Sequence, residues 1–201
     1  MIGVVPGREP KRTVIVGAHY DTKDIPGFVG AIDSGSGTAV AVQLARTLRP
    51  RQVRPTVVFA LFDGEESPRG TPDTTEDFRR RGLRGSKVAA KKLPRAEAMI
   101  LLDFVGNRKL RLAREDLSDF HLWERLRSAA RRVGAGGAFP DTTQPEVSDD
   151  HVPFLKRGIP AVNLIDFDFP CWHKTCDDLS KVSTRSLDQT GEAVLQLLLS
   201  S

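Results

Sequence analysis

TVVFALFDGEE, residues 56–66, reads as a buried β-strand that ends abruptly in acidic side chains. Its β-branched and aromatic residues favour extended structure, and its length fits a strand. Adjacent glutamates are common on solvated surfaces, but charges that emerge from a buried strand are costly unless something compensates them. Because neighbouring side chains of an extended backbone point in different directions, one of Glu65 and Glu66 can bind a metal ion while the other faces a metal-bound water.

Similar apolar runs recur along the chain and alternate with segments of helical periodicity. The predicted strands are residues 2–5, 13–18, 56–62, 98–104, 109–112 and 161–165. The first predicted helix begins near Ser36 and ends before Pro50. Four further helices are predicted at residues 86–92, 117–133, 150–156 and 184–199. Such an alternation is typical of an α/β sandwich around a mostly parallel sheet.

The segment from Ser67 to Gly82 breaks this pattern. It contains several proline, glycine and threonine residues and has no apolar period, which predicts a long surface loop. Long loops in small domains often act as lids or binding loops, and this one directly follows the two glutamates. A tolerated surface insertion is the other interpretation of the segment.

Length and composition narrow the possible classes of protein. The 201 residues, 39% of them hydrophobic and 28% charged, suit a single domain over residues 1–201. No apolar run reaches the roughly 18 residues of a membrane span, so we expect no membrane partner. The net charge of +4 lies largely in arginine clusters without interleaved aromatic residues, so we expect no nucleic-acid partner.

The first residues already read as a strand, because Ile2 follows the initial methionine and opens an apolar run. We therefore expect that structure upstream of this strand has been removed. No export signal is visible, so the compartment stays open. Cys171 and Cys176, which flank His173, fit either two free thiols or one small disulfide loop.

Polar residues with metal-binding side chains follow the other predicted strands. His19 closes the strand over residues 13–18, and Asp103 follows a run of four apolar residues. Asp21 could orient the imidazole of His19 and so determine which nitrogen faces a metal. Since ligands bind beyond the carboxyl ends of parallel strands, we expect His19, Asp103 and the two glutamates to meet at one edge of the sheet.

Two further segments supply candidate ligands. Asp33 lies in the small-residue turn GAIDSGSG, residues 30–37, where its two oxygens could bridge two cations. Glycine-rich turns at helix starts also bind phosphate, but a carboxylate within the turn would repel it. His173, with Asp33 and Glu66, completes a set of one histidine and two carboxylates that suits catalytic zinc. His151 is expected to hold a turn, and His121 to lie on an exposed helix.

Together these segments resemble the M28 peptidase family in order and rough spacing over most of the chain, up to Trp172-His173 and Asp177. The resemblance implies a three-layer α/β/α sandwich with a central mixed, mostly parallel sheet. It implies two zinc ions bridged by Asp33, with Glu66 and His173 on one ion and His19 and Asp103 on the other. Glu65 would then be the general base that takes a proton from metal-bound water and passes it to the leaving amine.

The same resemblance extends to glutaminyl cyclases, through residues 62–66 and the stretch from Asp149 to His173. In those enzymes one zinc is held by residues that match Asp33, Glu66 and His173. Glu65, Asp103 and Asp149 match the acidic network that shuttles protons during cyclisation. Two features depart from that pattern: no tryptophan closely follows the glutamate pair, and Asn163 stands where cyclases usually carry a histidine.

We therefore expect a zinc aminopeptidase that acts on peptides and binds two zinc ions, with Glu65, Asp21 and Asp149 as catalytic residues. The alternative is the cyclisation of N-terminal glutamine with one zinc ion. A second alternative is a non-catalytic binding module of the same fold. All five candidate ligands and Glu65 are present, which counts against that module.

Overall fold

The centre of the molecule is a five-stranded sheet, seen in a computed structural model that describes residues 1–72 and 74–201. The strands lie in the order β1-β3-β2-β4-β7. Their bounds are Ile2–Val5 for β1, Glu9–His19 for β2, Pro55–Phe62 for β3, Ala98–Leu102 for β4 and Ala161–Leu164 for β7. The β2, β3, β4 and β7 strands run parallel, and β1 runs antiparallel to β3. The predicted mixed, mostly parallel sheet is confirmed.

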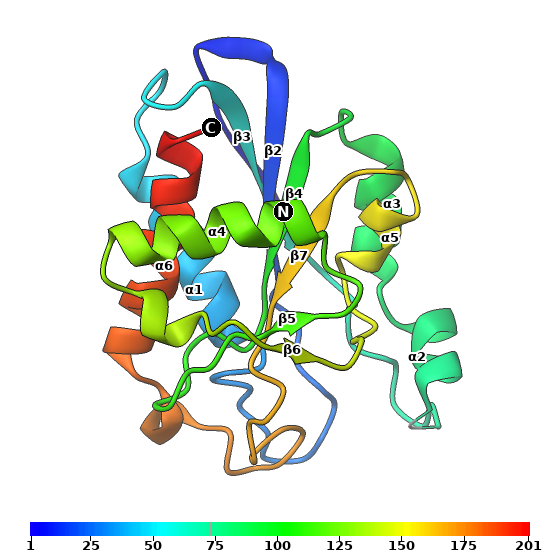
Figure 1. The fold of residues 1–201 in the computed structure, drawn as a ribbon. Helices are drawn as coiled ribbons and strands as arrows, with labels where there is room; N and C mark the ends of the chain where they lie inside the picture. Colours follow the sequence, from blue (N-terminus) through cyan, green and yellow to red (C-terminus); the bar gives the residue numbers. More distant parts are fainter. Residues whose placement is uncertain (73) are drawn as a thin grey trace.

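Helices cover both faces of this sheet (Figure 1). One face carries α1 (Gly35–Thr47), α4 (Phe120–Arg132) and α6 (Thr184–Leu199), and the other carries α3 (Arg84–Lys92) and α5 (Val152–Leu155). Because side chains alternate along a strand, β2 contributes Val14 and Val16 to the first core and Ile15 to the second. The three-layer arrangement is therefore confirmed.

The long helices begin where a polar side chain caps them. The Asp119 carboxylate accepts a hydrogen bond from the Leu122 amide at the start of α4, at 2.8 Å. The Ser183 side chain does the same for the Ser186 amide at the start of α6. Each cap satisfies a backbone donor that the helix itself leaves free. Both helices then bury one apolar stripe against the sheet, which fits the helical periodicity of the sequence.

The segment predicted as a long loop contains a helix, α2, over Thr75–Arg81. Its start is capped by Thr74, whose side chain accepts a hydrogen bond from the Asp77 amide. None of the residues of α2 is buried. The prediction was wrong because a helix without a buried face leaves no apolar period in the sequence.

The predicted strand at residues 109–112 was also wrong. The backbone there bonds to other partners: the Arg111 amide donates to the Asp166 carboxylate and the Leu112 amide donates to the Ala138 carbonyl. A short two-stranded sheet follows, formed by β5 (Arg114–Glu115) and β6 (Thr143–Gln144). Two short 3-10 helices lie at Gly136–Ala138 and Leu179–Lys181.

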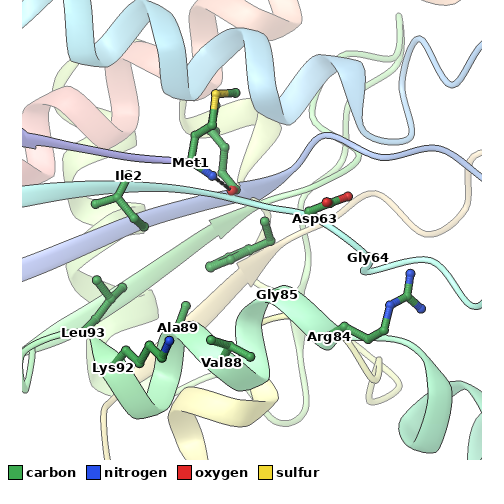
Figure 2. A pocket seen from close by; sticks show the side chains of 12 residues that line it. Met1, Ile2, Asp63, Gly64, Arg84, Gly85, Val88, Ala89, Lys92 and Leu93 are labelled. Carbon is green, nitrogen blue, oxygen red and sulfur yellow. Dashed lines mark hydrogen bonds between the residues drawn. The ribbon is translucent and has the colours of Figure 1, made fainter.

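The edge strand β1 borders a hollow of about 520 Å³ that lies between it and α3. Ile2 lines one side of it, while Val88 and Leu93 line the other (Figure 2).

No helix in the described part of the chain is long and apolar enough to cross a membrane.

Candidate metal and catalytic site

The candidate residues from three strands meet beyond the carboxyl ends of these strands. His19 is the last residue of β2, and it pairs in register with Phe62, the last residue of β3. Glu65 follows β3 after two residues, and Asp103 directly follows β4. Parallel strands therefore deliver these side chains to one edge of the sheet, as the sequence indicates.

The candidate ligands form two groups that share Asp33. In the first group, His19 Nε2 lies 3.4 Å from Asp33 Oδ1 and 3.3 Å from Asp103 Oδ1. In the second group, His173 Nε2 lies 3.5 Å from Asp33 Oδ2 and 3.3 Å from Glu66 Oε1. In each group the three ligand atoms lie within 4.8 Å of one another. Each oxygen of Asp33 thus faces a different histidine.

The burial of these groups fits a metal site. Asp33, Glu66 and Asp103 are all less than 5% exposed. Asp33 Oδ2 has no hydrogen-bond partner among the described residues. Unpaired buried carboxylates are costly unless a cation compensates them. Imidazole nitrogens and carboxylate oxygens are also ligands that zinc accepts, so the donor set suits the ion that the sequence predicts.

The hydrogen bonds of His19 turn one ring nitrogen toward this site. Its Nδ1 lies 3.1 Å from the main-chain carbonyl oxygen of Asp21, and its Nε2 faces the carboxylates. Because a carbonyl oxygen can only accept, Nδ1 carries a proton in either charge state of the ring. A metal ion bound here would replace the proton on Nε2 and take its lone pair. Asp21 therefore orients His19 mainly through its carbonyl, with its carboxylate oxygen at 3.6 Å from Nδ1.

The carboxylate of Asp21 has another set of partners. Its two oxygens accept hydrogen bonds from the amides of Glu65 and Glu66, at 3.2 and 3.1 Å. Two consecutive amides that point at one carboxylate hold the turn after β3 in place. Asp21 thereby connects the end of β2 to the two glutamates that the sequence analysis singled out.

Buried hydroxyl groups connect the other ligand-bearing turns. The Ser36 hydroxyl lies within hydrogen-bonding distance of the carbonyls of Ile32 and Asp103, at 2.7 and 3.0 Å. Thr38 donates to the carbonyl of His19 at 2.7 Å, and Ser34 bonds to the same oxygen. These contacts join the first turn of α1 to the strand ends that carry the ligands.

Glu65 lies in the same pocket and is 6% exposed. Burial raises the pKa of Glu65 well above its usual range; the positive charge of His19 opposes this, and the nearby carboxylates of Asp149 and Asp150 reinforce it. Burial would also raise the pKa of Glu66, but His173 and Lys23 lower it. The pKa values of the two adjacent glutamates are therefore shifted in opposite directions, upward for Glu65 and downward for Glu66.

Asp149 lies at the inner wall of this pocket. Its Oδ2 accepts a hydrogen bond from the Asn163 side-chain amide at 2.7 Å, and its Oδ1 accepts one from the Asp150 amide at 2.6 Å. Asn163 and Asp150 are both fully buried. The carboxylate of Asp149 is thus held in one orientation beside the acidic cluster.

The pocket has a volume of about 580 Å³ and an aromatic wall. Phe104 and Phe167 stack with their ring centroids 6.1 Å apart, and Trp172 lies 5.0 Å from Phe167. On the rim, Arg79 of α2 donates to Ser148 at 2.5 Å and to Glu146 at 3.2 Å. These contacts join α2 to the segment before Asp149, so the predicted loop forms part of the pocket.

His173 lies in a loop that a disulfide closes. Cys171 and Cys176, for which the sequence left two states open, are bonded in the structure, with Cα atoms 5.5 Å apart. His173 has a φ of 51°, which is uncommon for a residue other than glycine. Trp172 stacks on its imidazole, with ring centroids 4.5 Å apart. The residues Cys171 to Asp177 are called the His173 loop below.

Lys23 is a charged residue beside the site that was not predicted from the sequence. Its Nζ lies 3.1 Å from Glu66 Oε2. Its place between His19 and Asp33 in the chain was the only available signal. Of the two other histidines, His121 is exposed on α4, while His151 is fully buried with its Nε2 3.1 Å from Glu115 Oε1.

The sequence matches a known protein family over almost its whole length. The family model "Peptidase family M28" matches residues 1–198. Aminopeptidase YwaD of Bacillus subtilis is 32% identical over 197 residues, which cover 90% of this chain and 39% of that protein. A glutaminyl-peptide cyclotransferase of Drosophila melanogaster is 28% identical over 89% of this chain and 58% of its own length. The chain thus spans about two fifths to three fifths of these relatives.

Solved structures give a similar picture. The crystal structure of an Acidobacteriales bacterium glutaminyl cyclase superposes with a TM-score of 0.84 and 29% identity. The match covers 98% of this chain and 71% of that one.

Proposed function

Since the chain belongs to peptidase family M28, we propose that it is a zinc-dependent aminopeptidase that removes N-terminal residues from peptides. The observation that carries this proposal is the pair of ligand groups that share Asp33 beside the buried Glu65. One ion would be held by His19, Asp33 and Asp103, and the other by Asp33, Glu66 and His173. When bound, zinc supplies a Lewis acid for the scissile carbonyl and makes water a stronger acid.

The protein's own residues would then move one proton. Glu65 takes it from the attacking water and passes it to the nitrogen of the leaving amine. Glu65 is buried in the same pocket as both ligand groups, where its carboxylate can hold the proton between the two transfers. Asp21 supports this role because its carboxylate holds the Glu65 amide.

The pocket would accept the N-terminal residue of a peptide. The apolar rings of Phe104, Phe167 and Trp172 offer a surface for its side chain. The acidic interior attracts a positively charged α-amino group, while the bond from Arg79 to Glu146 closes one side of the rim. A pocket that attracts a free α-amino group favours chain ends over internal peptide bonds.

A second candidate function is cyclisation of N-terminal glutamine with one zinc ion at Asp33, Glu66 and His173. Similarity to proteins named as glutaminyl cyclases supports it, as does the buried Asp149 next to the acidic cluster. Asn163 counts against it: a carboxamide, unlike an imidazole, cannot accept a proton from Asp149 near neutral pH. A binding module without activity is the third candidate.

Metal analysis combined with two substrate types separates these functions. Purified protein would be assayed for zinc content, for release of amino acids from aminoacyl peptides and for release of ammonia from glutaminyl peptides. Two zinc ions per chain with free amino acids as products would support the aminopeptidase. One zinc ion with ammonia release would support the cyclase, and zinc-loaded protein that turns over neither substrate would support the binding module.

A further inference from the structure

The orientation of the Asp33 carboxylate is controlled by its main chain. Its Oδ1 and Oδ2 face two different histidines, at 3.4 and 3.5 Å. No hydrogen bond to Oδ2 is present in residues 1–72 and 74–201, so no neighbouring donor aligns that oxygen. A short side chain with two χ angles has little freedom once its backbone is held. Whatever holds the main chain at Asp33 therefore aligns the carboxylate shared by the two ligand groups.

The buried side chain of Asp177 holds the amides of that main chain. Asp177 Oδ1 accepts a hydrogen bond from the Ile32 amide at 2.8 Å, and its Oδ2 accepts one from the Asp33 amide at 3.1 Å. Asp177 is fully buried, and its own carbonyl lies 3.5 Å from the Ala31 amide. Three successive amides of the turn thus point at one residue, which lies 144 positions from Asp33 in the sequence.

Asp177 is also the last residue of the His173 loop. Its amide donates to the Lys174 carbonyl at 2.9 Å, and the Lys174 amide donates to the Cys171 carbonyl at 3.0 Å. The disulfide between Cys171 and Cys176 closes the loop next to Asp177. The loop that carries His173 and the turn that carries Asp33 are consequently joined through one carboxylate.

We propose that Asp177 is a positioning residue, which sets the separation of His173 and Asp33 and so prepares both for one metal ion. The inference rests on the metal site proposed above. Side chains that orient metal ligands in this way typically change metal affinity by about 10- to 100-fold when they are removed. Asp177 would not touch the substrate, and its effect would pass through the geometry of the two ligands.

The test uses Co²⁺ as a probe, because its visible absorption reports the geometry of its ligands. Metal-free wild-type protein and the variants Asp177→Ala and Asp177→Asn would be titrated with Co²⁺. Asp178→Asn serves as the matched control, since this neighbouring carboxylate bonds to Ser180 instead. We expect Asp177→Ala to bind Co²⁺ roughly 10- to 100-fold more weakly, with an altered spectrum per bound ion. Asp177→Asn keeps one acceptor oxygen, so its affinity should lie between those of wild type and Asp177→Ala.

The outcomes separate the inference from the function on which it rests. If wild-type protein binds no Co²⁺, the proposed metal site itself is wrong. If wild type binds Co²⁺ and both Asp177 variants match it in affinity and spectrum, only the positioning role is wrong. If Asp177→Ala does not fold, as circular dichroism would show, the Asp177→Asn titration decides alone. An Asp178→Asn protein as weak as the Asp177 variants would also overturn the proposal.

Discussion

Replacing Glu65 by glutamine should separate catalysis from folding, because the substitution keeps the shape of the side chain and removes its ability to accept a proton. A general base typically contributes a factor of about 10² to 10⁴ in rate, so kcat should fall by that factor. This loss corresponds to roughly 3 to 5 kcal/mol in the activation barrier. Metal content should stay unchanged, since Glu65 belongs to neither ligand group.

Whereas kcat should fall, the metal-free variant should keep more of its stability than metal-free wild type as pH rises. Burial raises the pKa of Glu65 in the folded protein, whereas the unfolded chain releases the same proton near 4.5. As pH rises above 4.5, the unfolded state loses this proton while the folded state keeps it, so wild-type stability falls by at most about 1.4 kcal/mol per pH unit. Glutamine has no proton to release, so the variant should lose less stability between pH 5 and pH 7.

The assay combines kcat on an aminoacyl p-nitroanilide with thermal unfolding of metal-free protein at pH 5 and pH 7. Glu192→Gln, on the exposed side of α6, is the control and should match wild type in both measurements. Turnover within threefold of wild type would refute the role of Glu65 as the base. A variant that loses activity and is also less stable than wild type at both pH values would show that the lost turnover reflects folding.

Three further substitutions test the surrounding structure. Asp21→Ala removes the acceptor of the Glu65 and Glu66 amides, and at roughly 1 to 3 kcal/mol for each unsatisfied donor the free energy of unfolding should fall by about 2 to 4 kcal/mol, given the long bonds. Urea unfolding measures this, and a loss below about 1 kcal/mol would contradict the two bonds. Burial and the charge of Asp149 raise the pKa of Asp150 to about 8, so metal-free wild type should lose stability as pH rises from about 4 towards 8, and Asp150→Asn should flatten that dependence. Melting curves at pH 5 and pH 8 check this, and an equal change of stability between these pH values in both proteins would refute it. Phe154→Ala should cost about 3 to 5 kcal/mol, because the ring is fully buried between α5 and the sheet. Urea unfolding again measures it, and a cost below about 1.5 kcal/mol would mean that the neighbours collapse into the space.

Much of the site could be predicted because its residues follow strongly apolar strands. His19 and Asp103 end or follow runs whose buried character is evident from the sequence alone. Parallel pairing then brings them together with Glu65, since the carboxyl ends of such strands share one edge. The same physical rule that predicts the sheet therefore predicts that these candidate side chains meet.

Other contacts leave no periodic signal in the sequence. The bonds from Asp177 to the Asp33 turn join residues far apart in the chain, and an aspartate that accepts from amides looks like any turn residue. Lys23 looks like an ordinary loop lysine in the sequence, and only the fold brings it next to Glu66. The exposed helix α2 lacks a buried face, although Thr74 and Asp77 form a recognisable start signal.

The shared position of Asp33 makes the five candidate ligands unequal under mutation. Substitution of an outer ligand, such as His19 or His173, breaks one group and leaves the three members of the other intact. Substitution of Asp33 takes a member from both groups at once. Related proteins could therefore change from two ions to one by substitution at any outer position, because one complete group would remain at every step. Substitution at Asp33 would leave no complete group for selection to retain.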